Sequence, residues 1–418
     1  MRLFIKIRDV LTLHERRNAV VLFCLMLIGM ILEMLGVGLV VPIVALLIQG
    51  DLSAQYPVVG PIMNSLGNPT QVQMVVGVML FLVALYLTKN IFLAYLVWRQ
   101  TKYAFNVQAM LSQRLFKNYL QQPYVFHLQR NSAELIRNVT TEASLFSSHV
   151  LIPIMLLFTE SLVVVGVGAV LMVVEPIGTI LVLLVVGGAG WVFYNLTRIR
   201  VNKWGKNRQF HDGCRLQHLQ QGLGGVKDVK ILGREAEFLL QYIEHNSKSA
   251  FAAQHQVALQ QMPRLALELL AVAGLTLLVI VMAFQGEGLA NVAPTLGLFA
   301  AAAFRLMPSV NRLLGALQTL RFSLPVINTL HQELQTPSVS DTSFSQLNTK
   351  IFFQNEIVLT DVSFCYPDSL VSAVKGITIK IKKGQSVGII GPSGSGKSTL
   401  IDLILGLLQA DNGRIEVD

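Results

Sequence analysis

Eight residues near the end of the printed sequence have the types and spacing of a phosphate-binding loop. They run from Gly391 to Ser398 and read Gly-Pro-Ser-Gly-Ser-Gly-Lys-Ser, which is the GxxxxGK[ST] pattern. The glycines let the backbone curl so that successive N–H groups point at phosphate oxygens. Lys397 is expected to reach the β- and γ-phosphates of ATP, and the Ser398 hydroxyl to bind Mg²⁺. The motif therefore predicts ATP and Mg²⁺ as cofactors. The expected ATP contacts are Gly391, Ser393, Gly394, Ser395, Gly396, Lys397, Ser398 and Thr399.

The elements that must position this loop can also be predicted. Ser386–Ile390 has the composition of a short buried strand that leads into the loop, and Thr399–Leu408 that of an apolar-rich helix that follows it. Upstream, Glu356–Phe364 and Gly376–Ile381 alternate like strands, and Lys382–Gln385 is typical of a turn. Strand, loop and helix in this order distinguish a nucleotide-binding loop from a chance match.

Most of the remaining chain is too apolar for a soluble domain. Of 418 residues, 53% are hydrophobic and 14% charged, with a mean hydropathy of +0.56. Its apolar runs are long enough to cross a bilayer, which takes roughly 20 residues. From about Phe322 onward the composition becomes polar and mixed. We expect six membrane spans, at about Val20–Ile48, Val72–Trp98, Val150–Val174, Ile177–Leu196, Leu265–Phe284 and Val292–Leu314.

Basic residues predict how these spans are oriented. Residues 49–71, 175–176 and 285–293 carry no Lys or Arg, whereas the N-terminus and the other two connections are rich in both. Positive charge stays on the cytoplasmic side, so we expect both termini and the ATP-binding segment in the cytoplasm of a plasma (inner) membrane protein. The net charge of +9 follows from this topology, since the cations are scattered beside apolar runs rather than gathered on a nucleic-acid-binding face.

The two cytoplasmic connections are predicted to be helical hairpins. Thr101–Gln122 and Arg198–Gln221 continue the membrane helices, and the chain turns back through short crossing segments at Pro123–Asn131 and Gly222–Gly233. The alternative is that both connections are ordinary solvated loops. The three cysteines, Cys24, Cys214 and Cys365, lie far apart, and we interpret them as reduced residues without a metal role.

The segments Val362–Tyr366, Ile377–Ile381, Gly384–Gln385 and Gly391–Leu400 resemble the beginning of the nucleotide-binding domain of an ABC transporter. With six preceding helices, the chain resembles an ABC exporter half-transporter. The resemblance implies a membrane all-α domain over residues 1–330, a linker over 331–350 and the N-terminal part of an α/β P-loop ATPase domain over 351–418. It also implies that Tyr366 stacks on adenine, that the hairpin tips are coupling helices, and that two half-transporters pair, as a homodimer in the simplest case.

The family's remaining catalytic motifs are not present in this sequence. A glutamine loop, an LSGGQ-type signature, a Walker B strand and a switch histidine would all follow the phosphate loop, and the sequence ends at Asp418. The resemblance therefore implies an ATP-hydrolysing translocase at full length, whereas this segment by itself contains no catalytic residues and is expected at most to bind nucleotide weakly. A genuinely truncated product is the alternative to a fragment of a longer protein.

Three stretches resemble the bacterial lipid-linked oligosaccharide flippases: Leu32–Leu39, Gly225–Glu235 and Ala303–Leu314. The last contains Arg305 and Arg312, which lie seven residues apart on one helix face. Ionisable residues at membrane depth usually face a cavity or a partner, and arginine suits phosphate oxygens. One hypothesis is that both arginines attract a substrate pyrophosphate. The equal alternative is that Arg305 pairs with an acid such as Glu33, Glu160 or Glu268 while Arg312 reaches the inner interface.

The outward-facing connection between the first two spans is predicted to contain a short helix. Helical spacing is seen at Val59, Ile62, Met63 and Leu66, so a short amphipathic helix there would meet a lipid tail or simply cap the bundle.

The leading interpretation is an ATP-driven flippase or exporter of a lipid-linked or amphipathic substrate. The alternatives are a drug or peptide exporter, a non-transporting ATP-regulated membrane protein, and a membrane-anchored P-loop kinase.

Overall fold

The computed structural model describes residues 2–38, 71–174, 176–284, 289–336, 353–367 and 369–418. The chain divides into two compact units. The first contains residues 1–113 and 136–333, and the second contains residues 114–135 and 334–418. The first unit is helical, and the second combines a helical hairpin tip with a small sheet. The amphipathic segment expected around Val59, Ile62, Met63 and Leu66 lies outside the described residues.

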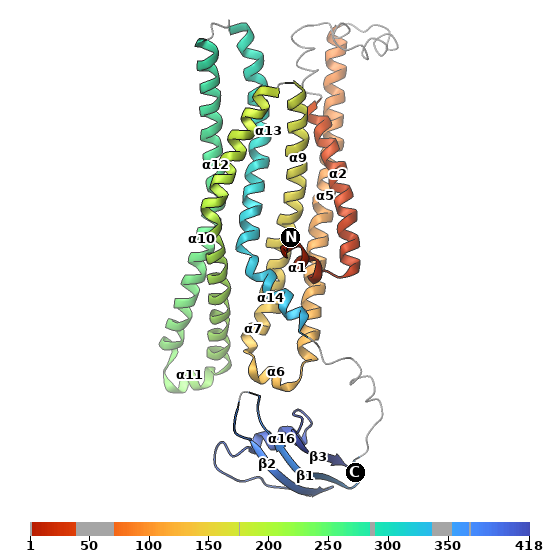
Figure 1. Cartoon of the computed structure of the whole chain (residues 1–418), viewed down its shortest axis with the longest axis vertical. Helices are drawn as coiled ribbons and strands as arrows, with labels where there is room; N and C mark the ends of the chain where they lie inside the picture. The colour runs from red at the N-terminus through yellow and green to blue at the C-terminus, as the bar shows by residue number, and fades with distance from the viewer. Residues whose placement is uncertain (1, 39–70, 175, 285–288, 337–352, 368) are drawn as a thin grey trace. The chain divides into compact units, whose positions relative to one another are not determined.

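Long helices contain the described residues of all six expected spans, of which residues 39–48 of the first lie outside the described part of the chain (Figure 1). Three of them, searched over the described residues only, are long and apolar enough to cross a membrane, at Leu13–Gly36, Val76–Leu120 and Ser132–Ala169. The other expected spans lie in helices whose side chains are only partly described. The predicted helical membrane architecture is confirmed. The helices are α2 (Leu13–Gly38), α5 (Gln71–Leu120), α9 (Ile152–Val174), α10 (Pro176–Gly224), α12 (Glu235–Phe284) and α13 (Leu289–Phe322).

A short helix before the first span was not predicted. In α1 (Arg2–Val10) one face is buried, with Ile7 and Val10 at 6% and 2% exposure, while Phe4 and Ile5 are exposed. Thr12 and Glu15 then form a capping box at the start of α2: the Thr12 backbone N–H donates to Glu15 Oε2 at 2.7 Å, and the Glu15 N–H donates to Thr12 Oγ1 at 3.3 Å. This reciprocal pairing satisfies two free donors at the helix start. The Thr-x-x-Glu spacing is the sequence signal from which this helix start could have been predicted.

Charged pairs link the helices at membrane depth. Lys89 on α5 lies 3.3 Å from Glu33 on α2, and both side chains are buried. The Tyr86 hydroxyl donates to the Gly36 carbonyl at 3.2 Å and so joins the same two helices. Ionisable groups inside a bilayer are costly unless they are paired. These contacts therefore define how α2 and α5 pack.

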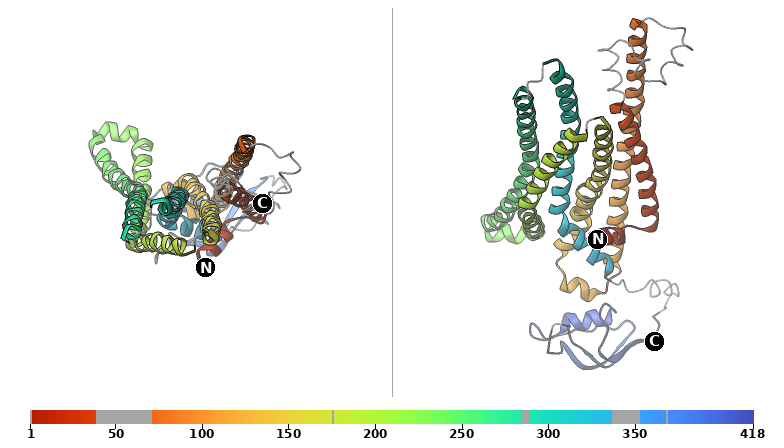
Figure 2. Two further views of the ribbon diagram at one scale, coloured as in Figure 1. Left: turned by 90° about the horizontal axis from the view of Figure 1, so that it is seen from above. Right: turned by 45° about the horizontal axis from the view of Figure 1, so that its top comes forward.

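The helices α10 and α12 form a long antiparallel pair that splays away from the other helices toward its α11 turn (Figure 2). Where α10 crosses the end of α13, a Cβ on Gly205 would lie 2.0 Å from the Phe322 carbonyl oxygen. A side chain at position 205 would force the helices apart. Glycine at this helical position is therefore explained by close approach of the backbones.

A network of charged side chains joins α10 and α12 to the helical stretch that leads into α9. That stretch consists of α7 (Ser132–Arg137), η1 (Asn138–Glu142), α8 (Ala143–Leu145) and η2 (Phe146–Leu151). Arg208 of α10 lies 3.5 Å from Glu142 and 3.1 Å from Asp212, and the Ser249 hydroxyl of α12 donates to Asp212 at 2.6 Å. All four side chains are buried. Glu142 is the last residue of the π-helical segment η1, and such segments are frequent at functional sites.

Both long helical hairpins have the predicted form. The helix α5 continues to Leu120 and turns through α6 (Tyr124–Gln129), and α10 continues to Gly224 and turns through α11 (Val226–Leu232). Gly233 follows the last residue of α11 with a φ of 64°, which suits glycine. After α13, the helix α14 (Leu324–Gln335) includes the first residues of the expected linker, whose remainder falls largely outside the described residues.

The second unit contains a three-stranded antiparallel sheet with the order β2-β1-β3. Its strands are β1 (Glu356–Phe364), β2 (Val374–Lys382) and β3 (Asn412–Val417). The predicted strands at Glu356–Phe364 and Gly376–Ile381 are confirmed. The helix α16 (Lys397–Ile404) packs on the sheet through Leu403, against Leu359 and Val362. The core of this unit therefore holds the helix that starts at the phosphate loop.

Candidate nucleotide-binding site

The phosphate loop enters α16 through a glycine that the fold requires. Gly396 occupies the position before the first helical residue with a φ of 83°, and a Cβ there would lie 2.1 Å from the Ala373 carbonyl oxygen. Gly394 has a φ of 82°, but a Cβ there meets nothing within 4 Å. Backbone of this kind is favourable only for glycine. The two glycines shape the loop, and Gly396 also lets it lie against the start of β2.

Lys397 folds back over the loop. Its Nζ donates to the backbone carbonyls of Gly391 at 2.8 Å and Pro392 at 2.7 Å. These two carbonyl oxygens accept hydrogen bonds from the ammonium group, and phosphate oxygens at the loop could accept from the same N–H donors. The ammonium group therefore stays at the loop, as a lysine that binds phosphate must.

The residues present fit an ATP phosphate chain with its Mg²⁺ ion. The loop glycines leave the backbone uncovered, the Lys397 ammonium group lies at the loop, and Ser398 is exposed in the first turn of α16. Ser393 and Ser395 are exposed on the same loop. Lys397 would hold phosphate oxygens and the Ser398 hydroxyl would face the cation, which would neutralise phosphate charge. These assignments remain predictions.

The strand predicted at Ser386–Ile390 is not present among the described strands. The segment has no regular structure and its side chains are exposed, with Ile390 at 95%. A strand exists only through hydrogen bonds to a neighbouring strand, and none of β1, β2 and β3 pairs with these residues. The prediction of a buried strand here is wrong for the described structure, which contains no neighbouring strand to pair with this apolar segment.

The helix after the loop is shorter than predicted. We expected it over Thr399–Leu408, and α16 begins at Lys397 and ends at Ile404. Gly406 then adopts a φ of 71°, which is typical of a residue that terminates a helix. Leu408 nevertheless packs in the core. An apolar residue at this position is therefore explained by burial and not by a place in the helix.

Tyr366 and Thr399 contact each other. The Tyr366 hydroxyl lies 3.1 Å from Thr399 Oγ1, and its ring packs edge-on against Phe364 at a centroid distance of 5.1 Å. Thr399 is buried at 6% exposure. The structure thus brings Tyr366 to the first turn of α16, next to the loop. Its stacking on adenine remains a prediction.

The short helix α6 packs against this same unit. Tyr124 and Val125 lie against the core formed by Leu359, Val362 and Phe364. Both parts belong to the second unit, so the hairpin tip and the sheet are in direct contact. The sequence predicted the tip but did not identify which of its side chains touch the sheet.

The arginines predicted to bind substrate have different outcomes. Arg312 on α13 lies 2.5 Å from Glu160 on α9, with side-chain exposures of 46% and 8%. Glu160 was one of the acids considered as a partner for Arg305, and it pairs with Arg312 instead. Arg305 lies in α13, in a stretch whose side chains fall outside the described part of the structure.

Comparison with known proteins places this arrangement in a family. The model of the ABC transporter transmembrane region matches residues 39–305, and the ABC transporter model matches residues 374–418. The chain is 24% identical over 313 residues to an ATP-dependent lipid A-core flippase of Nitrosococcus oceani, covering 74% of this chain and 51% of that protein. It is 22% identical over 402 residues to the protein of that name from Wigglesworthia glossinidia brevipalpis, covering 91% and 65%.

A solved structure supports the fold independently. The chain superposes on a bacterial Atm1-family ABC exporter with ATP bound with a TM-score of 0.70 and 17% identity, covering 96% of this chain and 68% of that one. The chain spans between about half and two thirds of the length of these curated relatives. The transmembrane match, which covers more than half of the sequence, and the phosphate loop in its expected place show that this chain belongs to the ABC transporter family.

Proposed function

We propose that the protein is an ATP-driven transporter that moves a lipid-linked substrate across the membrane, and that this substrate is a lipid-linked oligosaccharide. In this proposal the phosphate loop binds ATP with Mg²⁺, two half-transporters pair as a homodimer, and both termini lie on the cytoplasmic side of the inner membrane. The relatives named lipid A-core flippases support a lipid-related substrate. The oligosaccharide assignment rests on the local resemblances at Leu32–Leu39, Gly225–Glu235 and Ala303–Leu314.

The observation that carries the proposal is the Arg312–Glu160 pair inside the membrane region. Glu160 is buried, but Arg312 keeps 46% of its side chain exposed. An ionised guanidinium group that is paired on one side and open on the other has donors left for a second anion. A pyrophosphate-linked lipid would offer that anion at membrane depth, where an uncompensated charge is costly.

The assay is ATP hydrolysis by the protein at its natural length in proteoliposomes, with different compounds added as stimulants. A lipid-linked oligosaccharide should raise the rate more than lipid A or an apolar drug. Arg312→Ala should reduce that stimulation at least fivefold. The matched control is Arg321→Ala on the same helix, since Arg321 donates to the Tyr194 hydroxyl at 2.7 Å.

Each outcome decides between the candidate functions. Stimulation by drugs alone would support a drug exporter, and stimulation by lipid A alone would support the function in the relatives' names. Absence of ATP hydrolysis under every condition would support a regulatory membrane protein. An Arg312→Ala variant with undiminished oligosaccharide stimulation would remove Arg312 from substrate binding while leaving the substrate class intact.

A further inference from the structure

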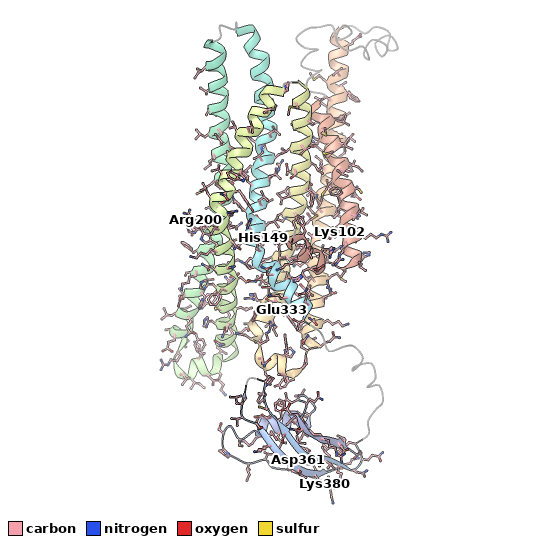
Figure 3. The ribbon with its side chains drawn as sticks, in the orientation of Figure 1. Lys102, His149, Arg200, Glu333, Asp361 and Lys380 are labelled. Carbon is pink, nitrogen blue, oxygen red and sulfur yellow. The ribbon has the colours of Figure 1, made fainter. Side chains whose placement is uncertain are left out.

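A cavity of about 660 Å³ lies between the first turns of α2 and the middle of α5. Two cations of α5, Arg99 and Lys102, belong to its lining, and Figure 3 labels Lys102. The cavity lies entirely within the first unit. It shares no residue with the phosphate loop or with the Arg312–Glu160 pair. Its cations are therefore not explained by either of those sites.

These two cations are open to a ligand. Arg99 is half-buried and Lys102 exposed, and neither pairs with an acidic side chain in the part of the chain that the structure describes. The lining does contain the acidic residue Glu15. Its carboxylate is buried and already accepts hydrogen bonds from the Thr12 backbone N–H at 2.7 Å and the Thr12 hydroxyl at 2.8 Å. Two open cations beside one occupied carboxylate attract an anion.

Both walls of the cavity lie at the same depth relative to the membrane. The Tyr103 hydroxyl of α5 donates to the backbone carbonyl of Glu15 on α2 at 3.2 Å. The first span is expected to begin at Val20 and the second to end at Trp98, and each helical residue rises 1.5 Å. Tyr103 and Glu15 each lie five residues outside these limits, or about 7.5 Å beyond the hydrocarbon. The hydrogen bond thus joins two residues that the span limits place at one level.

The cations lie within the headgroup layer. By the same rise, Arg99 lies about 1.5 Å and Lys102 about 6 Å outside the second span, and Asn18 lies about 3 Å outside the first. The polar layer of one leaflet is roughly 5–7.5 Å thick, since about 30 Å of hydrocarbon lies within a bilayer of 40–45 Å. Val21 and Leu22, which also line the cavity, fall just inside the hydrocarbon. The cavity therefore opens where headgroups meet acyl chains, and it continues along α5 beyond the layer.

Aromatic side chains on α5 mark the same depth. Tyr95 and Trp98 are exposed, and their ring centroids lie 6.2 Å apart. Tryptophan and tyrosine are enriched where the hydrocarbon meets the headgroups. Lys102 Nζ lies 4.9 Å from the centroid of the Trp98 ring, so this ammonium group is held beside that boundary. Basic pockets between helices on the cytoplasmic side of a membrane bind anionic headgroups.

We propose that Arg99 and Lys102, with Asn18 across the cavity, bind the phosphate group of an anionic phospholipid in the cytoplasmic leaflet. The phosphate oxygens accept hydrogen bonds from the guanidinium and ammonium groups, and the acyl chains pass Val21 into the bilayer. The bound lipid bridges α2 and α5. The inference rests on the membrane orientation of the proposed function, but it does not depend on which substrate is transported.

The test measures lipid binding to the protein at its natural length by native mass spectrometry, with phosphatidylglycerol titrated against phosphatidylcholine. Arg99→Ala with Lys102→Ala should weaken phosphatidylglycerol binding about 30-fold, the loss expected for two cations near a membrane surface. The matched control is Arg198→Ala with Arg200→Ala. These residues lie about 3 and 6 Å beyond the expected end of the fourth span, and neither lines the cavity. The control should bind within about twofold of the unchanged protein.

A second pair of variants tests the space in the cavity. Asn18→Trp leaves both cations in place but fills part of the cavity, and it should weaken phosphatidylglycerol binding by about tenfold or more. Asn18→Ala leaves the space open and should weaken binding by no more than about threefold. Basal ATP hydrolysis retained in each variant shows that it is folded, since these positions lie outside the phosphate loop.

Three results would overturn the proposal. Equal losses in the cavity variant and the control variant would show general membrane electrostatics. Unchanged binding in Asn18→Trp would show that the lipid does not occupy the cavity. Inorganic phosphate that binds through Arg99 and Lys102 while phosphatidylglycerol does not would show a soluble ligand.

These outcomes are independent of the transport assay. Loss of phosphatidylglycerol binding in the cavity variant with intact oligosaccharide stimulation would support the lipid site and the proposed function together. Oligosaccharide that fails to stimulate hydrolysis, with cavity-dependent phosphatidylglycerol binding retained, would refute the proposed substrate but not the lipid site.

Discussion

Two acidic residues on the α10–α12 pair offer a matched test of what burial does to an ion pair. Asp212 pairs with Arg208 and Glu244 pairs with Lys248, both at a spacing of four residues on a helix. The side chains of the first pair are 7% and 10% exposed, and those of the second 53% and 58%. Asp212→Asn and Glu244→Gln each remove one charge with little change of shape. The two changes differ in burial and also in the number of partners, because Asp212 lies 3.3 Å from Arg215 as well and accepts a hydrogen bond from Ser249.

The expected magnitudes follow from the contacts. Breaking a buried pair costs about 3–5 kcal/mol, because the remaining charge stays buried without its partner. Arg208 still contacts Glu142 at 3.5 Å, so we expect the lower end for Asp212→Asn, about 3 kcal/mol. Glu244→Gln loses a solvent-exposed helical pair, which water screens, so its cost should be small. The buried change should be several times more costly.

The measurement is thermal unfolding of the purified protein in nanodiscs, followed by intrinsic fluorescence. A loss of about 3 kcal/mol should lower the midpoint by roughly 5–10 °C, whereas Glu244→Gln should leave the midpoint nearly unchanged. Ser249→Ala should give an intermediate decrease, because its hydroxyl donates to Asp212 at 2.6 Å. Equal midpoints for Asp212→Asn and Glu244→Gln would refute the idea that this buried network holds the helices together.

Three further predictions concern other parts of the chain. Gly394→Ala should weaken binding of a fluorescent ATP analogue less than fivefold, because only the backbone φ is strained. Gly396→Ala should weaken it at least tenfold, because its Cβ also meets the Ala373 carbonyl oxygen. Equal losses in the two variants would contradict a clash at position 396. The pKa of His211 is lowered in the fold, so stability should fall as pH drops below about 6.5. Measured as the unfolding midpoint at pH 7.5 and 5.5, that fall should be smaller in His211→Gln, and an unchanged pH dependence would exclude this residue. Val125→Asp places a charge against the core of the sheet unit and should increase cleavage of that unit in limited proteolysis. The control is Leu128→Asp, which should not increase cleavage because the Leu128 side chain is already 48% exposed.

The features that were predicted correctly depend on residues close together in the chain. Helix periodicity and apolar length identified the membrane helices, and Pro123–Asn131 and Gly222–Gly233 marked the hairpin turns. The phosphate loop was predicted from eight consecutive residues, because its chemistry comes from local backbone curvature. The strand at Ser386–Ile390 shows the limit of this reasoning. Its composition is strand-like, but a strand also needs a neighbour, which composition does not supply.

The site residues show the same division. Glu33, Glu160 and Glu268 were considered as partners for Arg305, and Arg312 was expected either to attract substrate or to reach the inner interface, but Glu160 pairs with Arg312. The choice depends on which helices lie side by side, and α9 and α13 do. No sequence pattern distinguishes Gly205, yet a Cβ there would lie 2.0 Å from the Phe322 carbonyl oxygen.

By itself, the sequence determined that the chain has a helical membrane part and a loop for nucleotide phosphates, since both follow from patterns within one segment. Only the tertiary structure decided which charges meet. Arg200 and Lys248 are far apart along the chain, yet they line one cavity, and Asp212 and Ser249 bond across two helices. Electrostatic energy depends on distance in space and on burial, and neither is encoded in the order of residues along any one segment.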